Sequence, residues 1–193
     1  MQFVSKLTSL SALVVALATA AVGCGGSSPD AKNGGSEKAD GDLTGKAAPD
    51  FSLPLKSGKQ WSLSDAQGKV LIVDFWATWC KPCRESFPAL DELYKKHKKQ
   101  GFELLAINID DTPDEVDEFL KSTGVHFKIG FDPGGEKIAG KKYPIPTMPT
   151  TYVIDKSGKV RHVHAGFHDG EPDELEAEVT KLLGGGGDSD GDE

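Results

Sequence analysis

Two patterns of apolar residues occur in this chain: continuous apolar runs, which predict buried strands, and apolar residues at helical spacing, which predict helices. Continuous apolar runs at 69–75 and 102–109 are typical of buried strands, and a shorter run at 125–131 predicts a third. Apolar residues recur at helical spacing at 83–99 and 113–122. Since strands and helices alternate, we expect an α/β domain.

The pattern changes toward the C-terminus. Strand-like segments at 150–154 and 160–165 are separated by the turn sequence DKSG, which predicts an antiparallel hairpin. A last helix is expected at 172–183, because a proline suits its first turn and glycines follow its end. Residues 46–183 should therefore form one α/β sandwich, with a mixed central sheet flanked by helices.

Both ends differ from this domain in composition. Residues 1–23 hold a lysine and then a short run rich in Ala, Leu and Val, which is typical of a signal peptide and not of a membrane span. Residues 24–45 are mostly small and polar, which predicts a flexible tether. Residues 184–193 are a glycine run with an acidic end, which predicts a disordered tail.

The sequence AVGC at 21–24 is similar to a bacterial lipobox, in which the cysteine is lipidated and becomes the first residue of the mature protein. This resemblance implies lipidation of Cys24 and a location outside the cytoplasm, in the cell envelope. More than one acyl chain would hold the domain stably on a membrane surface. An ordinary signal peptide with an incidental cysteine, or an uncleaved anchor, is the alternative.

Two cysteines, Cys80 and Cys83, follow the apolar run at 69–75 and precede helical spacing. Such a layout places a dithiol where a strand turns into a helix. Backbone N–H groups and the helix dipole favour a thiolate at the helix N-terminus, the position of Cys80. A Cys-x-x-Cys pair can also be half of a zinc site, but the chain has only three cysteines and so no second pair. Redox chemistry is the prediction, with no metal and no cofactor.

Three motifs resemble one family. The segment VDFWATWCKPC at 73–83 resembles the active-site segment of thioredoxins and their extracytoplasmic relatives. APDFSL at 48–53 and MPTTYVID at 148–155 resemble the opening segment and second signature of TlpA/ResA-like (redoxin) thiol–disulfide oxidoreductases. The resemblance covers about 46–183 and implies a thioredoxin-like fold and thiol–disulfide exchange.

In such a protein Cys80 is the exposed nucleophile that attacks a disulfide, and Cys83 then resolves the mixed disulfide. Trp79 should flank the site, and Pro82 should restrict the turn between the cysteines. Lys81 either favours the Cys80 thiolate or is a solvated charge.

Asp74 lies within an otherwise apolar strand, where a carboxylate is costly to bury. The matching acid of thioredoxins lies beneath the dithiol and helps to move a proton to or from the inner cysteine. An aspartate at the edge of the sheet, with its own hydrogen bonds, is the alternative. ResA-like proteins usually carry a glutamate three residues after the second cysteine; here that residue is Ser86, so the glutamate's role does not pass to Glu85.

The resemblance also makes Pro149 the cis-proline that faces the dithiol, with the backbone of Met148 available to an extended substrate chain. His162 and His164 share one face of a strand, a spacing that can hold a metal. A solvent-facing strand explains them as well, and we expect no metal there.

The leading interpretation is a membrane-tethered oxidoreductase that reduces disulfides of exported proteins and is recharged by a membrane thiol donor. Family members reduce the haem-binding cysteines of apocytochrome c, which makes cytochrome c maturation a plausible pathway. The same dithiol runs in both directions, so the direction of electron flow stays open. A net charge of −8 gives no case for nucleic-acid binding.

Two alternatives remain. The redoxin family includes peroxiredoxin relatives, which makes a thiol peroxidase conceivable, but Thr78 stands two places before Cys80, where the peroxidatic pattern has threonine three places before its cysteine. A copper or zinc metallochaperone would use Cys80, Cys83 and a histidine.

Overall fold

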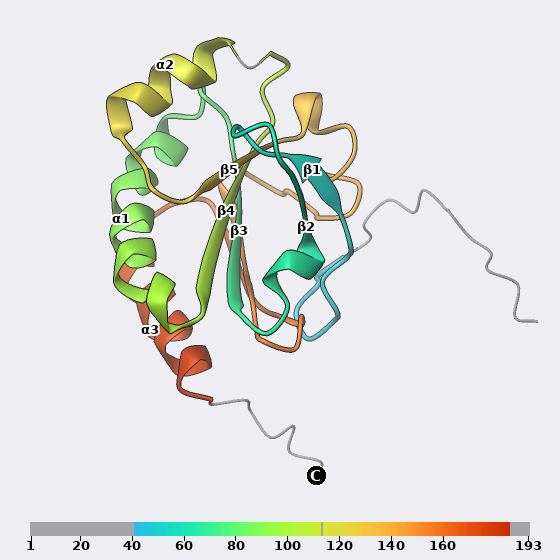
Figure 1. Cartoon of the computed structure of the whole chain (residues 1–193), viewed down its shortest axis with the longest axis vertical. Helices are drawn as coiled ribbons and strands as arrows, with labels where there is room; N and C mark the ends of the chain where they lie inside the picture. Colours follow the sequence, from blue (N-terminus) through green and yellow to red (C-terminus); the bar gives the residue numbers. More distant parts are fainter. Residues whose placement is uncertain (1–40, 113, 186–193) are drawn as a thin grey trace, which may run out of the picture. The chain divides into compact units, whose positions relative to one another are not determined.

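The computed structural model describes residues 41–112 and 114–185 (Figure 1). The expected signal peptide (1–23), Cys24, and most of the expected tether (24–45) and tail (184–193) lie outside these residues. The expectations for them remain predictions. Within the described ranges, no helix has both the length and the apolar character needed to cross a membrane.

The described part of the chain contains seven strands, three α-helices and three 3-10 helices. The strands are β1 (Ser52–Pro54), β2 (Gln60–Ser62), β3 (Val70–Trp76), β4 (Phe102–Asn108), β5 (Lys128–Phe131), β6 (Thr150–Ile154) and β7 (Val160–Ala165), the helices are α1 (Lys81–His97), α2 (Asp114–Thr123) and α3 (Glu171–Leu183), and the 3-10 helices are Leu63–Ala66, Lys98–Gln100 and Pro133–Gly135.

Five strands form one mixed sheet in the order β5-β4-β3-β6-β7. The pairs β3–β4 and β4–β5 are parallel, and each is connected through a helix, while β3–β6 and β6–β7 are antiparallel. β1 and β2 form a separate antiparallel hairpin. The expected α/β sandwich with a mixed central sheet and flanking helices is confirmed.

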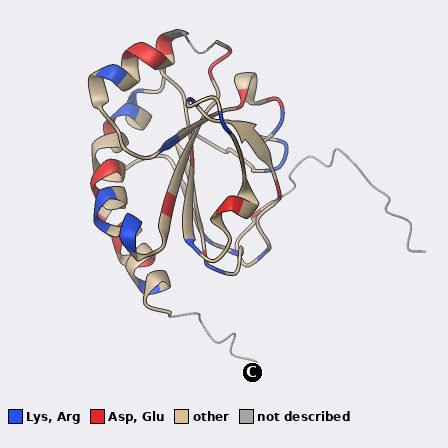
Figure 2. Cartoon of the chain, in the orientation of Figure 1, with Lys and Arg blue, Asp and Glu red and all other residues tan. Residues whose placement is uncertain are grey.

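The sheet separates two apolar cores. Alternate residues of β3, among them Ile72 and Trp76, pack with residues of the three helices. The residues between them, among them Val73 and Phe75, pack with the β1–β2 hairpin and Tyr143. Charged side chains lie mostly on the helices and in the connecting loops (Figure 2). Asp74 stands between Ile72 and Trp76 and shares their face of β3, so its carboxylate points into the core beneath the helices.

The structure corrects several boundaries. α1 begins at Lys81, two residues earlier than expected, because Cys80 caps it and a proline suits its first turn. Pro88 lies inside α1, but the helix is not interrupted there, and Phe87 and Leu90 on either side are buried in the core. β5 spans only Lys128–Phe131.

Candidate active site

The dithiol lies where β3 leads into α1. Cys80 is the N-cap of α1, and its Sγ accepts a hydrogen bond from the backbone N–H of Cys83 at 3.2 Å. The two cysteines form a disulfide. Cys80 is 4% exposed and Cys83 is fully buried. The expectation of an exposed Cys80 is therefore wrong for the disulfide form, since its sulfur is turned inward to Cys83, although Cys80 is the more accessible of the two.

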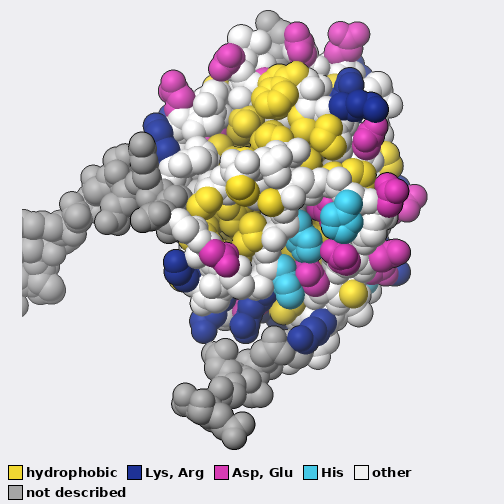
Figure 3. Space-filling view, turned by 180° about the vertical axis from the view of Figure 1, so that it is seen from behind, with side chains coloured by type: hydrophobic (Ala, Val, Ile, Leu, Met, Phe, Trp, Pro, Cys, Tyr) yellow, Lys and Arg dark blue, Asp and Glu magenta, His cyan; other side chains and the backbone are white. Residues whose placement is uncertain are grey.

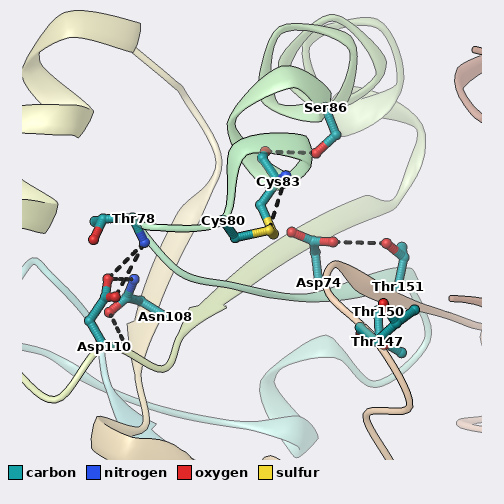
Figure 4. Close-up of a disulfide and its surroundings, with 10 residues drawn as sticks. All are labelled: Asp74, Thr78, Cys80, Cys83, Ser86, Asn108, Asp110, Thr147, Thr150 and Thr151. Atoms are coloured by element: carbon teal, nitrogen blue, oxygen red, sulfur yellow. Dashed lines mark hydrogen bonds between the residues drawn. A yellow bond between two sulfur atoms is a disulfide. The ribbon is translucent and has the colours of Figure 1, made fainter. Parts of the chain in front are cut away.

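Asp74 lies beneath the disulfide. Its side chain is fully buried in the middle of β3, and the Thr151 hydroxyl donates a hydrogen bond of 2.8 Å to its Oδ1. Its Oδ2 has no hydrogen-bond partner among the described residues. Figure 4 shows the carboxylate pointing between the disulfide and Thr151. The alternative of an aspartate at the sheet edge is excluded, because β3 is the central strand.

Burial dominates the acidity of Asp74. Loss of hydration raises its pKa from 3.8 to about 7; the Thr151 hydrogen bond opposes this rise, and the charge of Glu171 adds to it. A carboxyl group with a pKa near neutrality beside a dithiol is able to accept and return a proton at physiological pH.

The loop before β6 lies at the same end of the sheet as the dithiol, since Thr150 pairs with Phe75 at the end of β3. The Met148–Pro149 peptide bond is cis, as the resemblance implies. The Thr150 hydroxyl donates to the Thr147 carbonyl at 2.6 Å, and Figure 4 draws both side chains beside the site.

The surface next to the dithiol is apolar at one point and charged at another. Trp79 is 68% exposed, and it is the one large hydrophobic side chain exposed in the described part of the chain. Lys81 is exposed, and its Nζ lies 3.3 Å from Oε1 of Glu85 one helical turn later. The Lys81 charge is thus paired on the helix surface. Pro82 lies in the first turn of α1.

A polar cluster that the sequence reasoning missed anchors the loop before Cys80. The Thr78 N–H donates to Oδ2 of Asp110 at 2.9 Å, and the Thr78 hydroxyl donates to Glu115 at 3.2 Å. Asn108 also donates to Oδ2 of Asp110, at 2.7 Å (Figure 4). The sequence could have revealed this cluster through Asn108 and Asp110, two polar residues at and just after the end of β4. β4 is parallel to β3, and the carboxyl ends of parallel strands lie at the same edge of a sheet.

Two more buried polar residues adjoin the site. Ser86 stands at the position where the family usually has a glutamate. Its hydroxyl donates a hydrogen bond to the Cys83 carbonyl at 2.9 Å. Glu171, the first residue of α3, is only 2% exposed, and its Oε2 has no hydrogen-bond partner among the described residues. Nothing in the sequence pattern singled out Glu171.

The expectation of a solvent-facing strand is wrong for His164, whose side chain is 13% exposed, but not for His162, whose side chain is 40% exposed. α3 packs against this face of β7, and Glu178 lies 3.1 Å from Nδ1 of His162 and 2.9 Å from Nε2 of His164. The side chain of His164 is largely buried as a result. Within residues 41–112 and 114–185, no group of three or more His, Cys, Asp or Glu residues is arranged to hold a metal ion.

A disulfide at the start of a helix, above a buried carboxyl group and beside a cis-proline loop, is the arrangement of a thioredoxin-like thiol–disulfide oxidoreductase. Residues 44–163 match the model of the AhpC/TSA family, and the chain belongs to that family.

Relatives with known names agree with this class. The chain is 42% identical to the thiol-disulfide oxidoreductase ResA of Bacillus thuringiensis over 116 residues, which are 60% of this chain and 66% of the relative. It is 38% identical to ResA of Geobacillus kaustophilus over 137 residues, which are 71% of this chain and 78% of that one. A crystal structure assigned as a thiol:disulfide interchange protein DsbE, from Chlorobium tepidum, is 39% identical, with a TM-score of 0.68 over 72% of this chain and 97% of the other.

Proposed function

We propose that this protein is a lipid-anchored, extracytoplasmic thiol–disulfide oxidoreductase that reduces disulfides of exported proteins. The observation that carries the proposal is the Cys80–Cys83 disulfide, which lies at the helix N-terminus directly above the buried carboxyl group of Asp74. The helix terminus favours the Cys80 thiolate, and the buried carboxyl group serves the proton of Cys83.

The reaction conserves two electrons and two protons. The Cys80 thiolate attacks one sulfur of the substrate disulfide, and the other sulfur leaves as a thiolate and takes a proton from solvent. Cys83 then gives its proton to the Asp74 carboxylate and attacks Sγ of Cys80, which releases the second substrate sulfur as a thiolate that takes a proton from solvent. The substrate is reduced and the Cys80–Cys83 disulfide forms.

Trp79, Met148 and Pro149 are the proposed substrate contacts. Trp79 offers an exposed apolar ring beside Cys80, and the loop before β6 offers its backbone to an extended chain. Pro82 keeps the turn between the cysteines short.

The sequence at the N-terminus supports the proposed location, and the family resemblance supports the proposed pathway. Lipidation of Cys24 would fix the domain to a membrane surface outside the cytoplasm, where structural disulfides form and a reductant needs a thiol donor in the membrane. The haem-binding cysteines of apocytochrome c are the proposed substrates, in line with the family resemblance.

A peroxidase is the alternative that membership of the AhpC/TSA family raises. The Thr78 backbone and hydroxyl are both bonded to acidic side chains, Asp110 and Glu115, and not to Cys80. This disfavours a peroxidatic site. Peroxide consumption with a thiol donor separates the two activities, and the metal content of protein purified without chelator tests the metallochaperone alternative.

The reduction potential of the Cys80–Cys83 pair tests the proposal directly. We would equilibrate the protein with graded dithiothreitol or glutathione buffers and measure the fraction of disulfide. A potential at or below about −270 mV, that of thioredoxin, supports a reductant. A potential near about −120 mV, that of DsbA, would make the protein an oxidant and contradict the proposed direction.

A further inference from the structure

Three polar side chains lie opposite one another on neighbouring strands, in a row from the disulfide to the edge of the sheet. Asp74 of β3 pairs in register with Thr151 of β6, and Thr151 pairs with His164 of β7. Directly opposed residues of antiparallel strands place their side chains on the same face. These three residues, called the polar row below, therefore cross the sheet beneath α1 and α3.

A small cavity lies against the middle of the row. It leaves about 10 Å³ for the centre of a water molecule, which is room for one water. Its polar lining consists of Ser86 from α1, Thr151 from β6 and Glu171 from α3. The rest of the lining is apolar: Ala89, Leu90, Leu93, Phe167, Pro172 and Leu175.

Two buried carboxylate oxygens along this line lack a hydrogen-bond partner in the described part of the chain: Oδ2 of Asp74 and Oε2 of Glu171. Buried polar atoms in native proteins are rarely left unpaired, because each such atom costs free energy. A water in the cavity would reach Glu171 and the Thr151 hydroxyl, and this hydroxyl already donates to Asp74.

The outer end of the row reaches solvent through histidine and glutamate. His164 lies 2.9 Å from Glu178 and 3.9 Å from Glu174, and the exposed His168 lies 3.7 Å from Glu174. Figure 3 shows histidines gathered beside acidic side chains on this face of the molecule. Proton acceptors thus continue from the buried carboxyl groups to the surface.

Several groups set the charge of Glu171. Burial raises its pKa, while His164 and His168 lower it and Glu174 raises it. Asp74 faces it from β3, and α1 contributes only Ser86 and apolar side chains to the cavity. The hydrogen bond to Glu178 raises the pKa of His164. The pKa of the Glu171 carboxyl group and the pKa of the His164 imidazole are thus both raised, the first by burial and the second by its carboxylate neighbour.

We propose that Glu171 and the polar row form a proton path between the buried dithiol and the solvent beside β7. This inference rests on the proposed function. As the Cys80–Cys83 bond forms, the Cys83 proton passes to Asp74, then through the Thr151 hydroxyl and the cavity water to Glu171, and from there through His164 to solvent. Reduction of the disulfide runs the same path inward. Glu171 is a positioning residue, since it does not touch the sulfur atoms.

The burial of the inner cysteine and of Asp74 is the reason that a proton path is needed. Cys83 and Asp74 are both fully buried, so bulk water does not reach the proton that must leave when the disulfide forms. The family glutamate three residues after the second cysteine is Ser86 here. Glu171 supplies a carboxyl group above the row from α3 instead.

The test compares Glu171→Gln with Glu176→Gln in the full-length protein. Glu176 lies on the same helix, is partly exposed and pairs with Lys96 on the surface. The reduced proteins are oxidised with oxidised glutathione over a range of pH, in H₂O and in D₂O, and the rate is followed by tryptophan fluorescence. Thermal unfolding of each variant reports any structural change.

We expect Glu171→Gln to slow oxidation by about 10-fold, part of what a general acid–base group contributes, and to increase the solvent isotope effect. The inflection that reports Asp74 should move to lower pH, because the like charge of Glu171 is gone. Glu176→Gln should match the wild type in all three measurements. A wild-type rate, pH profile and isotope effect in Glu171→Gln would overturn the path.

His164→Gln repeats the test without removing a buried carboxylate, in case Glu171→Gln does not fold. Glutamine still donates a hydrogen bond to Glu178 but does not carry a proton onward, so the same slowing is expected. An unchanged pH profile and isotope effect in this variant also overturns the path. If the wild type does not exchange with disulfides, the proposed function itself is wrong. If the wild type exchanges and neither substitution changes its rate, pH profile or isotope effect, only the proton path is wrong.

Discussion

Thr151 holds one oxygen of Asp74 and leaves the other beside the disulfide. The hydroxyl donates at 2.8 Å to Oδ1, and Oδ2 receives no hydrogen bond from the described residues. This one hydrogen bond fixes the orientation of the carboxyl group, but it does not offset the loss of hydration, so the pKa is raised to about 7. Proton exchange with the inner cysteine needs this combination of fixed geometry and near-neutral acidity.

Replacing Asp74 by asparagine should remove a pH dependence of stability. The folded-state pKa of about 7 lies above the unfolded value of 3.8, so the folded state binds the proton more tightly. The contribution of Asp74 to stability should be largest below about pH 4, fall as pH rises, and be about 4 kcal/mol smaller above pH 7.

Urea unfolding of the disulfide form at about pH 5 and about pH 8 measures this slope. We expect Asp74→Asn to gain stability relative to the wild type as pH rises. Equal slopes for the two proteins would contradict a carboxyl group that titrates near neutrality.

Cys83→Ser should trap the mixed disulfide. Cys80 can still attack a substrate disulfide, but no inner thiol releases the substrate. Non-reducing electrophoresis and mass spectrometry should detect a covalent adduct at Cys80. Cys80→Ser is the matched control and should form no adduct, because Cys83 is fully buried. Adducts at Cys83 would reverse the assigned roles.

Trp79→Ala should weaken the reaction with protein substrates and leave stability nearly unchanged. The ring is 68% exposed, so its removal should alter the free energy of unfolding by no more than about 0.5 kcal/mol. The rate with a small disulfide should be kept while KM for a protein disulfide rises. Trp76→Ala is the contrasting variant, since Trp76 is fully buried and its loss should cost about 3–5 kcal/mol.

Asp110→Ala should loosen the loop that carries Thr78 toward the dithiol. The substitution removes the acceptor of the Thr78 N–H and of the Asn108 amide. We expect a loss of about 1–3 kcal/mol in stability, from chemical unfolding, because part-buried donors lose their partner. Asp111→Ala on the neighbouring exposed residue should have little effect. A stable Asp110→Ala protein would show that this cluster does not anchor the loop.

Cys24→Ser should release the protein from the membrane. If the cysteine carries lipid, its removal takes away the acyl chains that hold the domain on the surface. Cell fractionation and the mass of the purified protein measure this. An unchanged membrane fraction would point to an uncleaved anchor, and an unmodified Cys24 in the wild type would contradict lipidation.

The sequence was most informative where chemistry depends on neighbours along the chain. Cys80 and Cys83 were predicted from their spacing after an apolar strand. A buried Asp74 beneath the dithiol was one of two interpretations of a polar residue inside that strand. The hairpin of β6 and β7 followed from its turn residues. Local pattern sufficed because each feature is set within a few residues.

Features that depend on packing between distant segments were not predicted. Glu171 stands one residue before the helix that the sequence pattern predicts and is the first residue of α3 in the structure. Only the docking of α3 onto the sheet brings it near Asp74. The same docking covers His164, which periodicity alone had placed toward solvent. β1 and β2 have three residues each, too few for a period to show.

The central sheet also separates the redox site from a second apolar core that contains none of the proposed site residues. The dithiol, Asp74 and Glu171 all lie on the side of the helices, while Phe51, Trp61 and Tyr143 pack on the opposite side beneath the β1–β2 hairpin. Substitutions far apart and without shared partners act nearly independently. Substitutions on the hairpin side can therefore change thermostability, by engineering or in evolution, without changing the redox properties of the dithiol.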